Sequence, residues 1–148
     1  LHPGQHDTVI GISAAGGAAY VIGVLKTARE AGAATASVCC NSGVPMEQWA
    51  DWKICVDTGP EAITGSTRLK AGTAQKLILN LISTAVMIKT GKVLENFMIN
   101  VRPTNAKLLR RAAGIVAELT GAQESQAAEA LDQAEGSIRD AVSHLKRL

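Results

Sequence analysis

A ten-residue stretch near the middle of the chain concentrates the side chains best suited to chemistry on a small anionic ligand. Residues 61–70 contain one carboxylate, three hydroxyls and two cations, namely Glu61, Thr64, Ser66, Thr67, Arg68 and Lys70. Hydroxyls and a helix amino terminus bind phosphate or sugar oxygens, a cation neutralises charge, and a carboxylate accepts hydrogen bonds or moves a proton. A simpler role fits equally well, in which Ser66 or Thr67 caps the following helix and Arg68 is a surface residue.

Two other loops offer weaker candidates. The small-residue loop Ser13-Ala14-Ala15-Gly16-Gly17 matches neither the dinucleotide-binding glycine pattern nor the P-loop pattern with its lysine. Its backbone N–H groups could receive an anion, or its small residues could serve only a tight turn. The loop Asn41-Ser42-Gly43 is ordinary turn chemistry on its own. We take Ser13, Gly16 and Asn41 as candidate ligand contacts.

The elements that must position these loops alternate between strands and helices. β-branched and apolar runs predict strands over residues 8–13, 35–40 and 52–56, and helical periodicity predicts helices over residues 18–31 and 70–90. This alternation indicates an α/β fold with a parallel sheet between helical layers. Ligands bind at the carboxyl ends of such strands, where all three candidate loops lie.

The residue pattern in the last third of the chain predicts a small three-helix bundle. Asn105, Ser125 and Ser137 are candidate caps for helices that end near residues 119, 134 and 145. The pattern of small and apolar residues resembles that of ubiquitin-associated-type bundles. We therefore expect two domains, residues 1–103 and 104–148. The helix at 70–90 is apolar on most sides, so we also expect a second subunit to cover it.

Composition excludes several classes of protein. With 47% hydrophobic and 19% charged residues the chain can fill a core, and with 3% aromatic residues it lacks a stacking platform for nucleic acid. The three cysteines lack a metal-binding spacing and lie in apolar runs, which favours buried reduced thiols, no metal site and a cytoplasmic location. The longest apolar run, residues 77–88, is short and interrupted, so we expect no membrane span. The chain begins at Leu1 rather than at a methionine, which we interpret as a fragment of a longer protein.

The run GPEAITGSTRLKAGTAQKLILN at residues 59–80 closely resembles the signature of N-acetylmuramic acid 6-phosphate etherases and the related glucokinase regulatory proteins. The resemblance implies a three-layer αβα sugar isomerase (SIS) domain followed by a helical domain, a homodimer, an amino sugar 6-phosphate ligand and no cofactor. It also implies cleavage of the lactyl ether to N-acetylglucosamine 6-phosphate and D-lactate by two glutamates that lie upstream of Leu1. No catalytic residue is then expected in this chain. The implied substrate contacts are Glu61, Ser66, Thr67, Arg68, Lys70, Ser13, Gly16 and Asn41.

One loop departs from the family pattern. Family members usually read Ser-Gly-Arg-Thr-Pro-Tyr where this chain has Ala15-Gly16-Gly17-Ala18-Ala19-Tyr20, so a hydroxyl and a cation are lost. Each lost charge-assisted contact costs about 1 to 3 kcal/mol. The departure leaves open a non-catalytic regulator that binds a sugar phosphate and acts through a protein partner. An aldose-ketose isomerase is a third, weaker alternative to the etherase.

Overall fold

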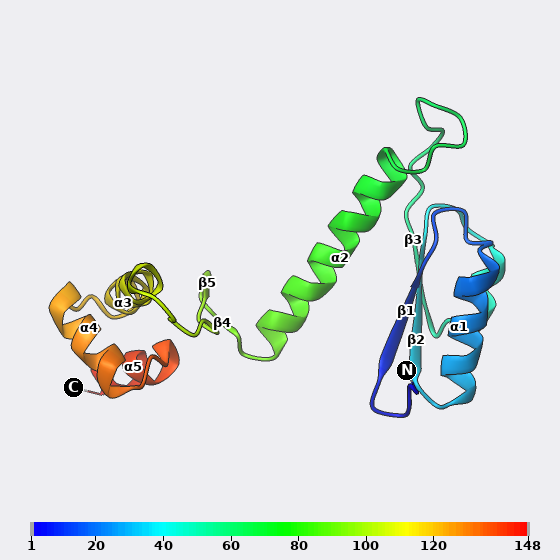
Figure 1. Cartoon of the computed structure of the whole chain (residues 1–148). Coiled ribbons are helices and arrows are strands. Elements are labelled where there is room, and N and C mark those ends of the chain that lie inside the picture. The colour runs from blue at the N-terminus through cyan, green and yellow to red at the C-terminus, as the bar shows by residue number, and fades with distance from the viewer. Residues whose placement is uncertain (1, 148) are drawn as a thin grey trace. The chain divides into compact units, whose positions relative to one another are not determined.

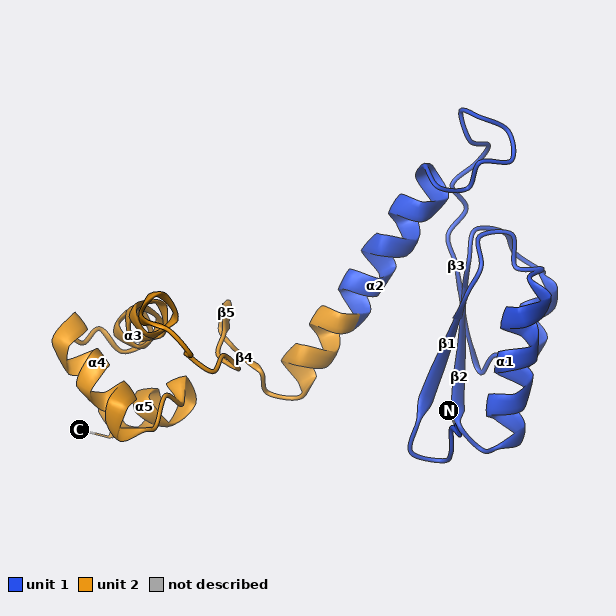
Figure 2. Cartoon of the chain, viewed as in Figure 1, with its two compact units in different colours: residues 1–82 blue, residues 83–148 orange. Residues whose placement is uncertain are grey.

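The computed structural model describes residues 2–147 and contains two compact units, one ending at Ile82 and the other beginning at Ser83 (Figure 2). The border between them falls inside one helix, α2 (Lys70–Lys89). Each unit is described below by itself.

Unit 1 is a parallel sheet with a crossover helix, as the alternating pattern predicts. Strands β1 (Thr8–Ile12), β2 (Ala34–Cys39) and β3 (Trp52–Cys55) lie in the order β1-β2-β3, and both pairs are parallel. Helix α1 (Ala19–Glu30) joins β1 to β2 and packs on the sheet (Figure 1). A short 3-10 helix, η1 (Pro45–Trp49), lies between β2 and β3 in the chain.

The core of unit 1 lies between the sheet and α1. Leu25, Cys39 and Met46 are fully buried there. Gly11 permits the close approach of α1, because a Cβ at this position would lie 2.7 Å from the Leu25 side chain and 2.9 Å from that of Val21. The glycine in the middle of β1 is therefore a packing requirement, which its position in an apolar run does not reveal.

A buried threonine and an aspartate tie β2 to the start of β3. The backbone N–H and hydroxyl of Thr35 both donate to Asp51 Oδ2, at 2.9 and 2.8 Å, and Arg29 Nη2 lies 3.6 Å from Asp51 Oδ1. The Thr35 backbone N–H, followed by its hydroxyl, holds the pKa of Asp51 below its ordinary value. This clamp fixes the edge of the sheet opposite the candidate loops.

Helix α2 is the least covered element. Ala71 is its only fully buried residue, and large apolar side chains along it are exposed: Leu77, Leu79, Leu81, Val86, Met87 and Ile88. By length and composition alone α2 could cross a membrane, because the whole helix carries few charges over twenty residues. The expectation of no membrane span stays a prediction. Gly91, with φ of 70°, follows the end of the helix.

In unit 2 the end of α2 is followed by a hairpin that the sequence did not predict. Strands β4 (Val93–Leu94) and β5 (Phe97–Met98) pair antiparallel, and Glu95 takes a positive φ of 54° in their turn. The pattern was missed because strands of two residues are too short to show alternation.

Three helices follow the hairpin, as predicted: α3 (Ala106–Thr120), α4 (Glu124–Gln133) and α5 (Ile138–Leu145). Asn105 caps α3 and Ser137 caps α5 through their side-chain oxygens, as expected. The expected cap at Ser125 was wrong, because Gln123 caps α4 in a reciprocal box with Gln126. Glutamine is a weaker cap than serine in general, so residue type pointed to the wrong position.

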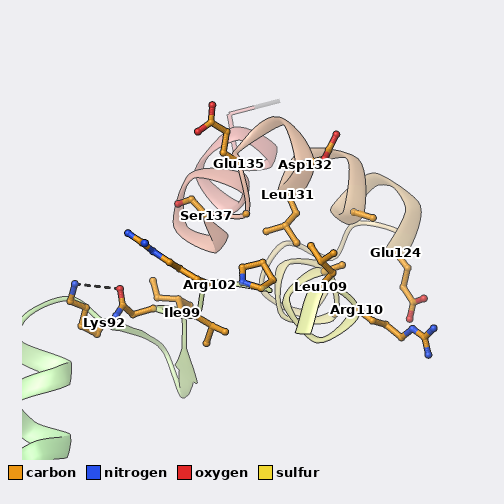
Figure 3. A pocket seen from close by; sticks show the side chains of 17 residues that line it. Lys92, Ile99, Arg102, Leu109, Arg110, Glu124, Leu131, Asp132, Glu135 and Ser137 are labelled. Atoms are coloured by element: carbon orange, nitrogen blue, oxygen red, sulfur yellow. Dashed lines mark hydrogen bonds between the residues drawn. The ribbon is translucent and has the colours of Figure 1, made fainter. Parts of the chain in front are cut away.

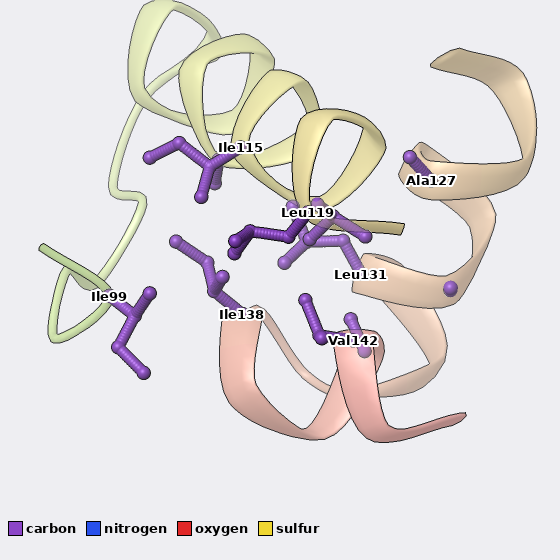
Figure 4. Packing of buried hydrophobic residues seen from close by; sticks show 11 residues of the cluster. Ile99, Ile115, Leu119, Ala127, Leu131, Ile138 and Val142 are labelled. Atoms are coloured by element: carbon purple, nitrogen blue, oxygen red, sulfur yellow. The ribbon is translucent and has the colours of Figure 1, made fainter. Parts of the chain in front are cut away.

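The core of unit 2 joins all three helices and the strand-to-helix connection (Figure 4). Its buried residues include Ile99, Val116, Leu131, Ile138 and Val142. Leu94 and Phe97 of the hairpin pack against the same cluster. The domain border at residues 103 and 104 stays a prediction.

Candidate functional site

The loops that follow β1 and β2 are joined at the carboxyl edge of the sheet. Cys40 N and Asn41 Nδ2 both donate to the Ala14 carbonyl, at 2.9 and 3.2 Å. Gly16 N donates to the carbonyl and the hydroxyl oxygen of Ser13, each at 3.1 Å. The structure thus brings Ser13, Gly16 and Asn41 together. It also uses the Gly16 N–H within the loop, which corrects the expectation that this group is available to an anion.

At the same edge of the sheet, the amino terminus of α1 has no capping side chain. Its cap residue, Ala18, makes no side-chain hydrogen bond, and the first turn holds no acidic residue. Nothing lies within 4 Å of the position that a Cβ on Gly17 would take, and Tyr20 is 83% exposed. Free N–H groups and the positive end of the helix dipole therefore face open space, which is the environment that an anion prefers.

Glu61 caps helix α2. The backbone N–H groups of Lys70 and Ala71 donate to its two carboxylate oxygens, each at 3.0 Å. Glu61, rather than Ser66 or Thr67, therefore fills the anion position at this helix terminus. The N–H groups of Ala71 and Lys70, in that order, and then the Lys70 charge hold the pKa of Glu61 below its ordinary value. A carboxylate held in this way suits positioning and hydrogen-bond acceptance better than proton donation.

The β3–α2 loop, which carries Glu61, begins beside the end of β2. Val56 N, directly after β3, donates to the Cys39 carbonyl at 3.0 Å. Burial raises the pKa of the neighbouring Cys40 thiol. The start of this loop is therefore next to the point where Cys40 and Asn41 leave β2.

The other residues of the predicted cluster are more exposed. Thr67 and Arg68 are exposed and Ser66 is half-buried. The side chain of Lys70 folds over Gly59, with Nζ 3.7 Å from the position that a Cβ there would take. Within residues 2–147, the hydrogen bonds do not join Ser66, Thr67 or Arg68 to the loops after β1 and β2. The described hydrogen bonds thus place the loops of Ser13, Gly16 and Asn41 in one group, and Glu61 with Lys70 in another.

The Glu61 cap predicts a stability that depends on pH. Because the folded-state pKa lies below the ordinary value of 4.5, the cap stabilises α2 fully above pH 4.5. This stabilisation is lost as the pH falls through the lower, folded-state pKa. In Glu61→Gln, hydrogen exchange of the α2 amides at neutral pH should be faster than in the wild type, and the difference should shrink on acidification.

Glu30→Gln is the matched control for Glu61→Gln, because Glu30 contacts only Lys26, at 3.9 Å on the surface. This control should leave α2 exchange unchanged at every pH. Equal α2 exchange in Glu61→Gln and the wild type at neutral pH would contradict the role of Glu61 as a cap.

A large hollow in unit 2 contains none of the predicted site residues (Figure 3). It is an open cavity of about 1230 Å³ next to α3, α4 and the connection before α3. Cations and acids line it in equal number: Lys92, Arg102, Arg110, Glu124, Asp132 and Glu135. Mixed charge does not select an anion, so we place the candidate site at the edge of the sheet instead. Residues 2–147 contain no cluster of histidine, cysteine and carboxylate side chains that could hold a metal ion.

Comparisons with known proteins agree with the fold and with the signature. The SIS domain matches residues 3–85, and the C-terminal lid domain of glucokinase regulatory protein matches residues 95–145. An N-acetylmuramic acid 6-phosphate etherase from Exiguobacterium sp. is 51% identical over 142 residues, covering 96% of this chain and 48% of the relative. The etherase from Pectobacterium atrosepticum is 52% identical over 136 residues, covering 92% and 45%.

A third etherase, from Cutibacterium acnes, is 49% identical over 142 residues, covering 96% of this chain and 47% of the relative. The chain therefore spans about half the length of the curated relatives that it matches. Because the SIS match takes in more than half of its residues, and etherase relatives align with nearly all of it, the chain belongs to the SIS-domain family.

Proposed function

We propose that this chain is the substrate-binding part of an N-acetylmuramic acid 6-phosphate etherase, a carbon-oxygen lyase. The observation that carries the proposal is the identity of about half of its residues to etherases across nearly its whole length. The reaction would release D-lactate and N-acetylglucosamine 6-phosphate, in the recycling of cell-wall sugars.

The geometry supports a binding role for this part of the protein. The uncapped amino terminus of α1 suits the phosphate group, with Ser13, Gly16 and Asn41 shaping the loops beside it. Glu61 and Lys70 are hydrogen-bonded to each other in the loop that leaves the same edge after β3, and Ser66, Thr67 and Arg68 supply hydroxyls and a cation. The general acid and base of the etherase would be carboxylates from the half of the relatives that this chain does not span. No cofactor is part of this proposal.

The exposed apolar side chains of α2 are explained if other protein surfaces cover this helix. Residues 70–85 of α2 lie within the SIS match, and polar residues such as Gln75 and Asn80 interrupt its apolar surface. We therefore propose that the remaining half of the SIS domain and a second subunit cover α2, in a cytoplasmic homodimer without membrane or nucleic-acid partners.

The test combines this chain with the half of an etherase that it does not span. The part of the Exiguobacterium etherase that precedes its region of similarity would be co-expressed with this chain and incubated with N-acetylmuramic acid 6-phosphate. We expect D-lactate from the pair and none from either piece alone, because the acid and base are in one piece and the sugar-phosphate contacts in the other. Re-pairing the two halves of the Exiguobacterium enzyme itself serves as the control. No lactate from our pair while that control is active would overturn the proposal.

A non-catalytic regulator is the second candidate, and two observations favour it. The loop Gly17-Ala18-Ala19 lacks the cation and hydroxyl of the family pattern, and residues 95–145 match the lid domain of a regulatory protein. In the same experiment, a regulator would bind N-acetylmuramic acid 6-phosphate without releasing D-lactate. Calorimetry on the co-expressed pair therefore separates the two functions.

A further inference from the structure

Two cysteines lie opposite each other at the ends of neighbouring strands. Cys39 is the last residue of β2 and Cys55 the last of β3, and the two are partners in the parallel register. Partners in a parallel pair project to the same face of the sheet, with strands about 4.8 Å apart. This separation falls within the range of Cα distances, about 4.4 to 6.8 Å, that a disulfide requires.

The Cys39 side chain also faces the neighbouring strand. Its Sγ lies 3.8 Å from the carbonyl of Ile54, the residue that precedes Cys55 on β3. Both cysteines are free in this structure. No large backbone movement is therefore needed to join them.

Their environments differ in a way that fits a two-step oxidation. Cys55 is exposed, contrary to the expectation that all three cysteines are buried, and Cys39 is fully buried. Burial raises the pKa of the Cys39 thiol to about 11, so this thiol stays protonated until a partner draws it into reaction. The protonated Cys39 thiol donates to the Asn41 carbonyl at 3.1 Å and to Glu47 Oε1 at 3.8 Å.

We propose that Cys39 and Cys55 form an oxidative modification site, at which hydrogen peroxide links the two strand ends through a reversible disulfide. In the first step the Cys55 sulfur attacks peroxide, which gives a sulfenic acid and one water. In the second step the Cys39 sulfur attacks the Cys55 sulfur, and the hydroxyl leaves as a second water with the Cys39 proton. The two thiols lose two electrons and peroxide gains them.

The third cysteine serves as an internal control. Cys40 lies one residue beyond Cys39, where the chain presents side chains to the opposite face, and it is buried there. It should therefore not take part in the linkage. The disulfide would fasten β2 to β3 immediately before Asn41 and before the loop that carries Thr58 and Glu61.

Peroxide treatment of the whole chain, followed by alkylation and tryptic digestion, tests the proposal. Cleavage after Lys53 separates the peptide that contains Cys39 and Cys40 from the peptide that contains Cys55. We expect a linked pair of these peptides, which dithiothreitol separates, and a fall in free thiols from three to one. Cys40→Ser should retain the linkage, whereas Cys39→Ser and Cys55→Ser should lose it.

Two results would overturn the proposal. One is a linkage that persists in Cys39→Ser and disappears in Cys40→Ser, which would show that Cys40 rather than Cys39 is bonded to Cys55. The other is over-oxidation of Cys55 without any linked peptide. Because Cys39→Ser and Cys40→Ser both alter buried positions, circular dichroism checks that each variant is folded before its linkage is scored. If either is not folded, the wild type and Cys55→Ser, which alters an exposed position, decide the outcome.

Discussion

Gly16→Ala is expected to destabilise unit 1 by about 2 to 5 kcal/mol, from backbone strain and overpacking together. Gly16 has a positive φ of 70°, and an added Cβ would lie 2.3 Å from Val44 Cγ2 and 2.5 Å from Val44 Cβ. The branch point of a short side chain cannot swing away, so the backbone must shift. That shift would strain two hydrogen bonds, from Gly16 N to Ser13 and from Met46 N to the Gly16 carbonyl.

Hydrogen exchange read peptide by peptide measures this effect, because a chain with two compact units has no single free energy of unfolding. Amides of β1 and β2 in Gly16→Ala should exchange roughly thirty-fold faster or more, since 1.4 kcal/mol corresponds to a factor of ten. The neighbouring Gly17→Ala is the control, because Gly17 has open space around it and no positive φ. Equal exchange in the two variants would show that the close contact with Val44 does not exist.

Ile138→Ala is expected to destabilise unit 2 by about 2 to 5 kcal/mol, the usual cost of an isoleucine-sized cavity in a core. Ile138 is 1% exposed and belongs to the cluster that joins α3, α4 and α5 (Figure 4). Because the unit has a single small core, the loss should reach all three helices. Exchange should accelerate in α3, α4 and α5 together and stay unchanged in β1 and β2.

Leu109→Ala provides the comparison on the surface of the same unit. Leu109 is 47% exposed on α3, so its truncation removes less apolar contact with the protein and creates no enclosed cavity. Ile138→Val should fall between the two, at about 0.5 to 1.5 kcal/mol. If Ile138→Ala and Leu109→Ala were equally mild, the three helices would not share the core described for unit 2.

The two glycine variants also bear on the proposed function. The loop that Gly16 shapes lies beside the uncapped terminus of α1, where the family pattern places a hydroxyl and a cation that this chain lacks. Because Gly17 is unobstructed, the position that carries arginine in the family has room for that side chain here. Under the proposed function, the altered loop would change ligand contacts without a change in the backbone.

The sequence by itself determined the features that depend on neighbouring residues. Apolar runs and small-residue turns predicted β1, α1, β2 and β3 in order, because the period of a strand or a helix is visible within a few residues. Asn105 and Ser137 were correctly predicted as caps, since a cap bonds to N–H groups two or three residues away. The run at residues 59–80 identified the family, which the comparisons confirm.

Only the tertiary structure decided the features that join residues far apart. Glu61 caps a helix that begins nine residues later, and Asn41 bonds to a loop twenty-seven residues earlier. Cys39 is the register partner of Cys55 on the neighbouring strand. None of these pairs has a fixed spacing, because each depends on how the intervening loop returns to the sheet. Strand register, burial and helix direction set these contacts, and these properties arise only when the whole sheet is assembled.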